Sequence, residues 1–155
     1  MPNQIDALNE LLKDKTFINW FSNSEMVDGG GKPMIFYHGS NSEFVVFDKS
    51  KIGSATDPGW LGEGFYFYTD IHEAMQYGKV RAYLLNIESP YMATAEENDE
   101  LANANNIKAS RAFTQMVRNN GYDGVYYNGN LRGETVVFEP NQIWKLNVES
   151  DDIEI

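Results

Sequence analysis

Cysteine is absent from this chain of 155 residues, and histidine is scarce, with His38 and His72 as its two examples. Without cysteine the chain has no disulfide, no thiolate nucleophile and no Cys-based zinc or iron–sulfur site. Two histidines are also few for a dedicated transition-metal site. We therefore expect a chemistry that needs no metal.

The chain also has few basic residues and no long apolar run. Twelve basic residues against 23 acidic ones give a formal net charge of −11. Such a surface repels phosphate backbones and anionic lipids, which disfavours a nucleic-acid partner and a membrane role but leaves room for a local dinucleotide pocket. No stretch approaches the length of a membrane span. The first 15 residues lack the apolar run of a signal peptide, so we expect a cytoplasmic protein.

The composition that is present favours one folded domain over residues 1–155. Hydrophobic residues make up 42% of the chain and aromatic residues 14%, which is enough for a packed core. The length fits a single domain, and neither an internal repeat nor a long linker divides it. Nine tyrosines and nine phenylalanines indicate aromatic-rich strands or a cleft lined by aromatic rings.

The apolar spacing along the chain predicts short helices and more numerous short strands. Residues 4–22 are typical of one or two amphipathic helices, and we expect the segment 1–22 to pack on the domain. Further helices are predicted from Asp70 through Tyr77 and over 108–119, with a helix or surface excursion over 95–106. Strands are predicted over 34–37, 43–47, 65–68, 80–87, 124–127 and 135–138. Because they follow no regular βαβ order, the pattern favours an α+β fold.

Three segments hold residues suited to chemistry, and the first is the end of the strand at 34–37. His38 stands there directly before Gly39 and Ser40, and a glycine lets a backbone approach a ligand closely. A strand-end histidine that hydrogen-bonds a loop would give the same pattern.

The second segment has the sequence Gly-Glu-Gly-Phe-Tyr-Phe-Tyr over residues 62–68. It is not a dinucleotide-binding fingerprint, because its glycines precede a strand and the third glycine of that motif is missing. Tyr77 follows eleven residues after Tyr66, on the predicted helix. Aromatic residues at these positions are also typical of simple packing in a strand and a helix.

The third segment begins at Glu134, which opens an apolar strand and shares a face with Val136 and Phe138. A carboxylate beside an apolar face is costly unless it is solvated or used, so Glu134 is a candidate site residue. A solvated glutamate at a strand end is the alternative. Glu139 lies in a Pro-Asn turn on the opposite face and is expected to be a turn residue.

The order of these segments resembles the His-Tyr-Glu class of ADP-ribosyltransferases, which includes diphtheria toxin and the poly(ADP-ribose) polymerases. Further residues look like the ADP-ribosyltransferase domains in the polyvalent proteins of phages and mobile elements. These residues are Trp20-Phe21, Gly31-Lys32-Pro33, Tyr122-Asp123-Gly124 and the segment 137–143. The resemblance covers roughly residues 17–146.

The resemblance implies that NAD is the substrate and that no metal is used. It also implies an ADP-ribosyltransferase-like fold, with two small, packed, antiparallel-rich β-sheets around an NAD cleft and short helices beside them. His38 matches the histidine that holds the ribose in the adenosine half of NAD. Gly39 matches the glycine whose backbone grips the nicotinamide amide, and Ser40 completes this NAD-binding motif.

The remaining matches concern the nicotinamide end of NAD. Tyr66 and Tyr77 match, including their spacing, two tyrosines that sandwich the nicotinamide ring, whose positive charge suits an aromatic face. Glu134 matches the catalytic glutamate, which hydrogen-bonds the 2′-hydroxyl of the adjoining ribose and stabilises its oxocarbenium character. The loop 50–61 would cover the donor, and the turn 128–133 would face the acceptor.

Two positions depart from the family pattern. Ala74 stands where many relatives have a serine that bonds the nicotinamide amide. Arg132 stands where relatives that modify arginine often carry Gln or Glu, so arginine modification is not supported.

The expected function is mono-ADP-ribosylation of a macromolecular acceptor, a host or competitor protein, by a phage or bacterial effector or toxin in the bacterial cytoplasm. Two alternatives stay open. One is an NAD glycohydrolase toxin, which would use water as the acceptor. The other is a non-catalytic acidic binding protein on the same fold.

Overall fold

The computed structural model describes residues 3–43, 45–52, 59–148 and 153. The helices are α1 (Gln4–Leu11), α2 (Lys15–Phe21), α3 (Ile71–Met75), α4 (Ala95–Ala104) and α5 (Ile107–Asn119), with short 3-10 turns η1 (Lys49–Lys51) and η2 (Pro140–Gln142). The strands are β1 (Phe36–Ser40), β2 (Phe65–Phe67), β3 (Lys79–Leu85), β4 (Pro90–Met92), β5 (Gly124–Tyr127), β6 (Glu134–Val137) and β7 (Ile143–Lys145).

The strands form two sheets that a β-bridge joins. The first sheet has the order β1-β3-β7 and is antiparallel throughout. The second has the order β2-β6-β5-β4, in which only the β4–β5 pair is parallel. Tyr37 at β1 and Tyr68 after β2 exchange backbone hydrogen bonds of 2.7 and 2.9 Å and so join the sheets. The prediction of an α+β fold with two antiparallel-rich sheets is confirmed.

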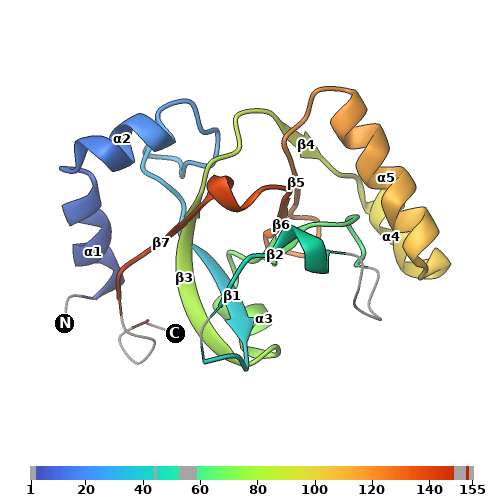
Figure 1. Cartoon of the computed structure of the whole chain (residues 1–155), viewed down its shortest axis with the longest axis horizontal. Coiled ribbons are helices and arrows are strands. Elements are labelled where there is room, and N and C mark those ends of the chain that lie inside the picture. Colours follow the sequence, from blue (N-terminus) through green and yellow to red (C-terminus); the bar gives the residue numbers. More distant parts are fainter. Residues whose placement is uncertain (1–2, 44, 53–58, 149–152, 154–155) are drawn as a thin grey trace.

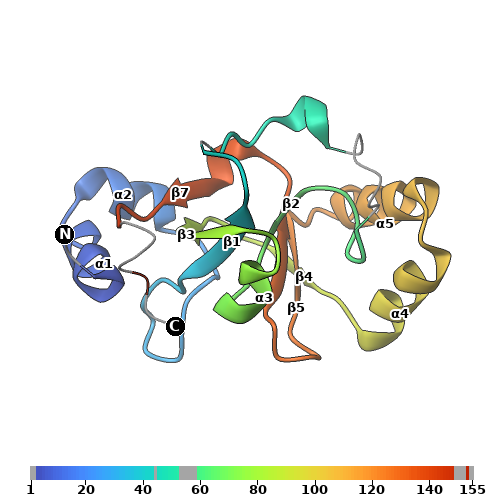
Figure 2. The ribbon, with the colours of Figure 1, turned by 90° about the horizontal axis from the view of Figure 1, so that it is seen from below.

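Helices cover the outer sides of the two sheets, at opposite ends of the molecule (Figure 1). The α1–α2 pair packs on the first sheet, where Phe17 meets Trp144 edge-on at 5.2 Å between ring centroids. The α4–α5 pair lies at the other end, where Phe113 and Val117 join a core cluster with Val125 and other residues of the second sheet. A third cluster combines side chains of both sheets, so the sheets are packed on each other. The view from below shows the same division, with the strands between the two pairs of helices (Figure 2).

Polar caps set where the helices begin, because the first backbone N–H groups of a helix lack partners within it. The side chains of Asn3, Asp14, Asp70, Thr94 and Asn106 each accept a backbone hydrogen bond at the start of their helix. The predicted helices over 4–22 and 108–119 and the start at Asp70 are confirmed. The acidic segment after Thr94 is a helix rather than an irregular excursion. Within the described ranges, no helix has both the length and the apolar character needed to cross a membrane.

The predicted strand at 43–47 is wrong for the residues that can be judged. Residues 43 and 45–47 have no strand pairing, and residue 44 lies outside the described part. The ring of Phe47 instead packs edge-on against Phe65 and Tyr83, so the apolar character here serves packing. Tyr77 was expected on a helix, but α3 ends at Met75 and Tyr77 lies in the turn that follows.

Candidate functional site

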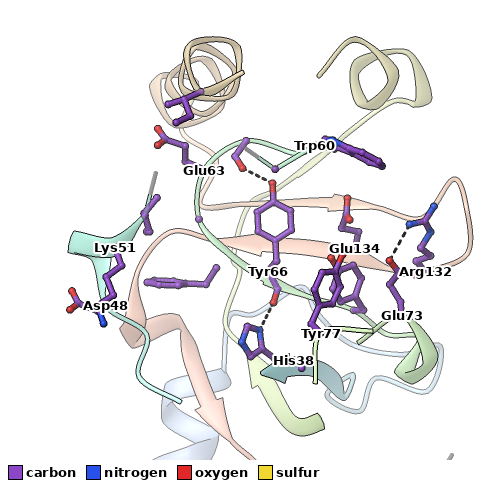
Figure 3. A pocket seen from close by; sticks show the side chains of 18 of the residues that line it. His38, Asp48, Lys51, Trp60, Glu63, Tyr66, Glu73, Tyr77, Arg132 and Glu134 are labelled. Atoms are coloured by element: carbon purple, nitrogen blue, oxygen red, sulfur yellow. Dashed lines mark hydrogen bonds and ion pairs between the residues drawn. The ribbon is translucent and has the colours of Figure 1, made fainter. Parts of the chain in front are cut away.

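A pocket of about 420 Å³ lies where the two sheets meet, a volume in the range of small-molecule sites. His38 and Gly39 of β1, Tyr66 of β2, Tyr77 after α3 and Glu134 of β6 all line it. Figure 3 shows the side chains of His38, Tyr66, Tyr77 and Glu134 converging. Asp48 and Lys51 lie at one side of Tyr66 and Arg132 at the other. The structure therefore brings five of the six predicted site residues to one cavity.

Ser40 is the exception, because it does not line the pocket. Its hydroxyl accepts a hydrogen bond of 3.1 Å from the backbone N–H of Ser42. The side chain thus supports the turn after β1, as serine hydroxyls commonly do in loops.

His38 has one ring nitrogen committed to the protein. Its Nδ1 lies 2.8 Å from the carbonyl oxygen of Tyr66 (Figure 3). Because a carbonyl only accepts, Nδ1 carries a proton, and in the neutral ring Nε2 is then a hydrogen-bond acceptor. Burial lowers the pKa of His38, with the positive charge of Arg81 acting in the same direction. The imidazole is therefore suited to accept a hydrogen bond from a ligand hydroxyl.

Gly39 is required by the protein itself, where β1 passes against α3. A Cβ at this position would overlap the carbonyl oxygen of Ala74. Ala74 is fully buried at this contact and does not line the pocket. The close backbone approach predicted for Gly39 is therefore first an approach to α3, and Ala74 has no access to a ligand in the pocket.

The two predicted tyrosines are held in different ways. The hydroxyl of Tyr66 donates to the carbonyl of Gly62 and accepts from the N–H of Leu61 at 3.0 Å, which fixes the loop before β2. The ring of Tyr77 stacks on Tyr68, with centroids 5.9 Å apart and ring planes within 6°. Tyr77 exposes 48% of its surface, whereas Tyr68 is buried.

Tyr68 is a pocket-lining residue that the sequence analysis did not select. Its position two residues after Tyr66 could have indicated it, because side chains at i and i+2 share one face of a strand. Burial raises the pKa of Tyr68, and the neighbouring Tyr77 hydroxyl and the negative charges of Glu134 and Glu73 raise it further. The phenol therefore stays protonated beside these carboxylates.

Glu134 is only 7% exposed, so the alternative of a solvated strand-end glutamate is wrong. It is the first residue of β6, pairs in register with Tyr127 of β5 and lines the pocket. A carboxylate in a site with little water acts on nearby charge more strongly than one in bulk solvent. This placement suits stabilisation of a positive charge that develops in the cavity.

An ion pair stands beside Glu134. The Arg132 guanidinium lies 3.1 Å from Glu73, with Nη1 facing Oε1 (Figure 3). The other oxygen of Glu73 accepts from the Gln76 amide at 3.1 Å. The sequence indicates Arg132 only as a departure from the family pattern and gives no sign of Glu73, because no local pattern links residues 59 positions apart.

No group of three or more His, Asp or Glu side chains suited to a metal ion occurs among the residues that the structure describes. The expectation of metal-free chemistry therefore remains a prediction. Of the loop 50–61, expected to cover the donor, residues 53–58 lie outside the described ranges, while Lys51, Ile52, Gly59 and Trp60 line the pocket.

Two antiparallel-rich sheets with short helices, arranged around a pocket, agree with an ADP-ribosyltransferase-like fold. The family model described as "ADP-Ribosyltransferase in polyvalent proteins" matches residues 28–151, and the chain belongs to this family. The match includes the whole pocket and leaves α1 and α2 outside it.

Two further comparisons add little. The chain is similar to a solved structure titled "Crystal structure of an anti-CRISPR protein", with 12% sequence identity and a TM-score of 0.42. That similarity covers 72% of this chain and 94% of the other. No curated protein matches the sequence.

Proposed function

We propose that this domain splits NAD at the bond between nicotinamide and ribose and transfers the ADP-ribose to a macromolecular acceptor, in the first place a protein. Membership of the family suggests ADP-ribosyltransferase activity. The observation that carries the proposal is that His38, Tyr66, Tyr77 and Glu134 come from separate segments and line one pocket.

The donor would be held by a hydrogen-bond acceptor at one end and by aromatic rings at the other. The Nε2 of neutral His38 accepts from a hydroxyl of the adenosine ribose. The rings of Tyr66 and Tyr77 hold the nicotinamide, whose cationic ring is attracted to an aromatic face. In support, the Tyr66 ring is anchored through its hydroxyl and the Tyr77 ring through its stack on Tyr68.

Glu134 would act on the bond that breaks. The electrons of the nicotinamide–ribose bond leave with nicotinamide, and the ribose carbon gains oxocarbenium character. The Glu134 carboxylate stabilises this positive charge, as carboxylates do in glycoside hydrolysis. The acceptor then bonds the same carbon through its nucleophilic atom and loses a proton. Water in place of the acceptor would give free ADP-ribose.

The test is incubation of the purified protein with NAD, labelled in its ADP-ribose part, and a bacterial lysate. Transfer predicts released nicotinamide together with label on protein. Nicotinamide with free ADP-ribose alone would identify a glycohydrolase, and NAD binding without any release would leave a non-catalytic binder. Repeating the assay with EDTA tests the metal-free prediction, since a loss of activity that a divalent ion restores would contradict it.

We base the proposed biological setting on the family to which the chain belongs. Domains of this kind occur in polyvalent proteins, and we place the acceptor among host or competitor proteins in a bacterial cytoplasm, where the domain would act as an effector or toxin. The net charge of −11 makes a nucleic-acid acceptor the less favourable choice.

A further inference from the structure

We infer that Glu73 and Arg132 act as a positioning pair, which ties the turn 128–133 to α3 and thereby fixes the carboxylate of Glu134 in the pocket. The inference rests on the proposed function, because it assigns a role in the same reaction. Neither residue is treated as a catalytic residue, since both act through Glu134.

The turn before Glu134 is attached to α3 through both side chain and backbone. The carbonyl oxygen of Arg132 accepts hydrogen bonds of 3.1 Å from the backbone N–H groups of Thr69 and Asp70, which lead into α3. The Thr69 hydroxyl donates to the same oxygen at 3.3 Å, and the ion pair with Glu73 adds a fourth attachment one turn further along the helix. Four bonds from a single residue to one helix start leave the turn little freedom.

Gly133, between Arg132 and Glu134, also shows that the turn packs closely against the start of α3. Gly133 has a φ of +60°, a conformation that favours glycine. A Cβ here would overlap the side chain of Thr69. One residue therefore separates the anchored Arg132 from Glu134, and a shift of the turn must move the carboxylate.

The ion pair is poorly explained as a surface interaction that adds stability. The side chain of Glu73 is 11% exposed and that of Arg132 is 37% exposed, so the pair is partly withdrawn from water. Buried ion pairs contribute little net stability, because desolvation offsets the attraction. Holding a defined geometry is a role that such a pair can fill.

Charge gives the pair a second effect on the same site. The negative charges of Glu73 and Glu134 both act on the Tyr68 hydroxyl, so the two carboxylates face one region of the pocket. Arg132 compensates the charge of Glu73 at this place. Without Arg132, the Glu73 carboxylate would lose its ion-pair partner at the wall of the pocket.

The experiment compares nicotinamide release by Arg132→Gln, Glu73→Gln and the double variant. Because a displacement of about 1 Å costs roughly 100-fold in rate, each single variant is expected to lose about 10- to 100-fold in kcat. KM for NAD should change much less, since the pair is not assigned to NAD binding. The double variant should be no slower than the slower single variant, because residues that act as a unit are not additive. Arg132→Lys, which keeps the charge, should recover part of the rate.

A matched control exists beyond the other end of β6. Arg118 lies 3.2 Å from Glu139 in an ion pair outside the pocket, so Arg118→Gln should keep the parental kcat. Parental kcat in Arg132→Gln and Glu73→Gln would overturn the inference. So would a raised KM with unchanged kcat, or losses that add in the double variant.

Amide hydrogen exchange over residues 128–134 separates this inference from the proposed function. Faster exchange of this turn in folded Arg132→Gln and Glu73→Gln, with a smaller change in Arg132→Lys and none in Arg118→Gln, supports the anchoring role whether or not NAD is cleaved. Unchanged exchange in folded Arg132→Gln and Glu73→Gln overturns it. If the parent protein releases no nicotinamide but the variants still exchange faster than the parent, the proposed enzymatic function is wrong and the anchoring of the turn is supported.

Discussion

Two glutamates near the opposite ends of β6 have very different surroundings. Glu134, its first residue, is 7% exposed and lines the pocket beside Tyr68. Glu139 lies two residues beyond the other end, with a side chain that is 33% exposed and accepts from Lys49 at 2.9 Å and Arg118 at 3.2 Å. The hydrogen bond from Lys49 and the one from Arg118 lower the pKa of Glu139.

The comparison contrasts a carboxylate that ties parts of the protein together with one that lines the pocket. At Glu139 two cations satisfy the charge near water, and the result is a link among η1, α5 and the end of β6. The side chain of Glu134 lies instead in the buried wall of a cavity, a position that is typical of functional sites. Activity should therefore depend on the first glutamate and hardly at all on the second.

The largest effect is expected for Glu134→Gln. Glutamine keeps the size of the side chain but removes the charge, and the lost contact acts mainly in the transition state. We expect kcat for nicotinamide release to fall by at least ~100-fold, with a much smaller change in KM. Glu100→Gln on the exposed side of α4 is the control for a lost surface charge. Equal rates in the parent and Glu134→Gln would remove the catalytic assignment.

Next in size is the loss of a ring from the pocket. Tyr77→Ala should weaken NAD binding by about 1–3 kcal/mol, the scale of base–aromatic stacking, measured by calorimetry. Tyr77→Phe keeps the ring and should be milder. Tyr66→Ala should weaken binding similarly, but it also removes the hydroxyl that fixes Leu61 and Gly62. If the folded alanine variants bind NAD as tightly as the parent, the two tyrosines serve only in packing.

The sequence was sufficient for features that local chemistry determines. The cap at Asp70 and the apolar strand that Glu134 opens are readable because each depends on a few neighbouring residues. The short strands β4 and β7 were missed, since three residues show no periodicity. The equally short β2 was predicted because its residues are aromatic and β-prone. The segment 43–47 has an apolar pattern that predicts a strand, but no strand forms there. Phe47 instead packs against other aromatic rings of the core.

The candidate site divides in the same way. The family resemblance identified His38, Tyr66, Tyr77 and Glu134 by order and spacing, and the fold then placed them in one pocket. The Glu73–Arg132 pair and the stack of Tyr77 on Tyr68 depend on where β2, α3 and the turn before β6 meet in space. Such contacts follow from topology, which spacing along the chain does not determine.

His38 gives a smaller effect, on the pH dependence of stability. Its pKa in the folded protein lies below the ordinary 6.5, chiefly because of burial. The unfolded chain then binds more protons, so stability decreases as the pH falls through about 6.5 toward the folded value. The melting temperature should drop between about pH 7.5 and pH 5.5, and less so in His38→Asn. His72→Asn, on the exposed side of α3, is the control, and an equal drop in the His38 variant would contradict this role.

The smallest effect is expected for Glu139→Gln, which breaks both ion pairs beyond the end of β6. The side chains of Lys49 and Arg118 are about half exposed, at 53% and 47%. Solvent therefore screens the two pairs, and the free energy of unfolding should fall by less than ~1 kcal/mol for each. Gln142 accepts from the backbone N–H of Glu139 at 2.9 Å, a bond that the substitution leaves in place.

Nicotinamide release by Glu139→Gln should match that of the parent, because Glu139 does not line the pocket with Glu134. The measurements are urea unfolding for stability and initial rates at saturating NAD for activity. A rate loss like that of Glu134→Gln would mean that the link from Glu139 through Lys49 to η1 holds the pocket in shape, since Asp48 and Lys51 flank Lys49 and line it. The two glutamates would then serve one site, and the contrast between the ends of β6 would be wrong.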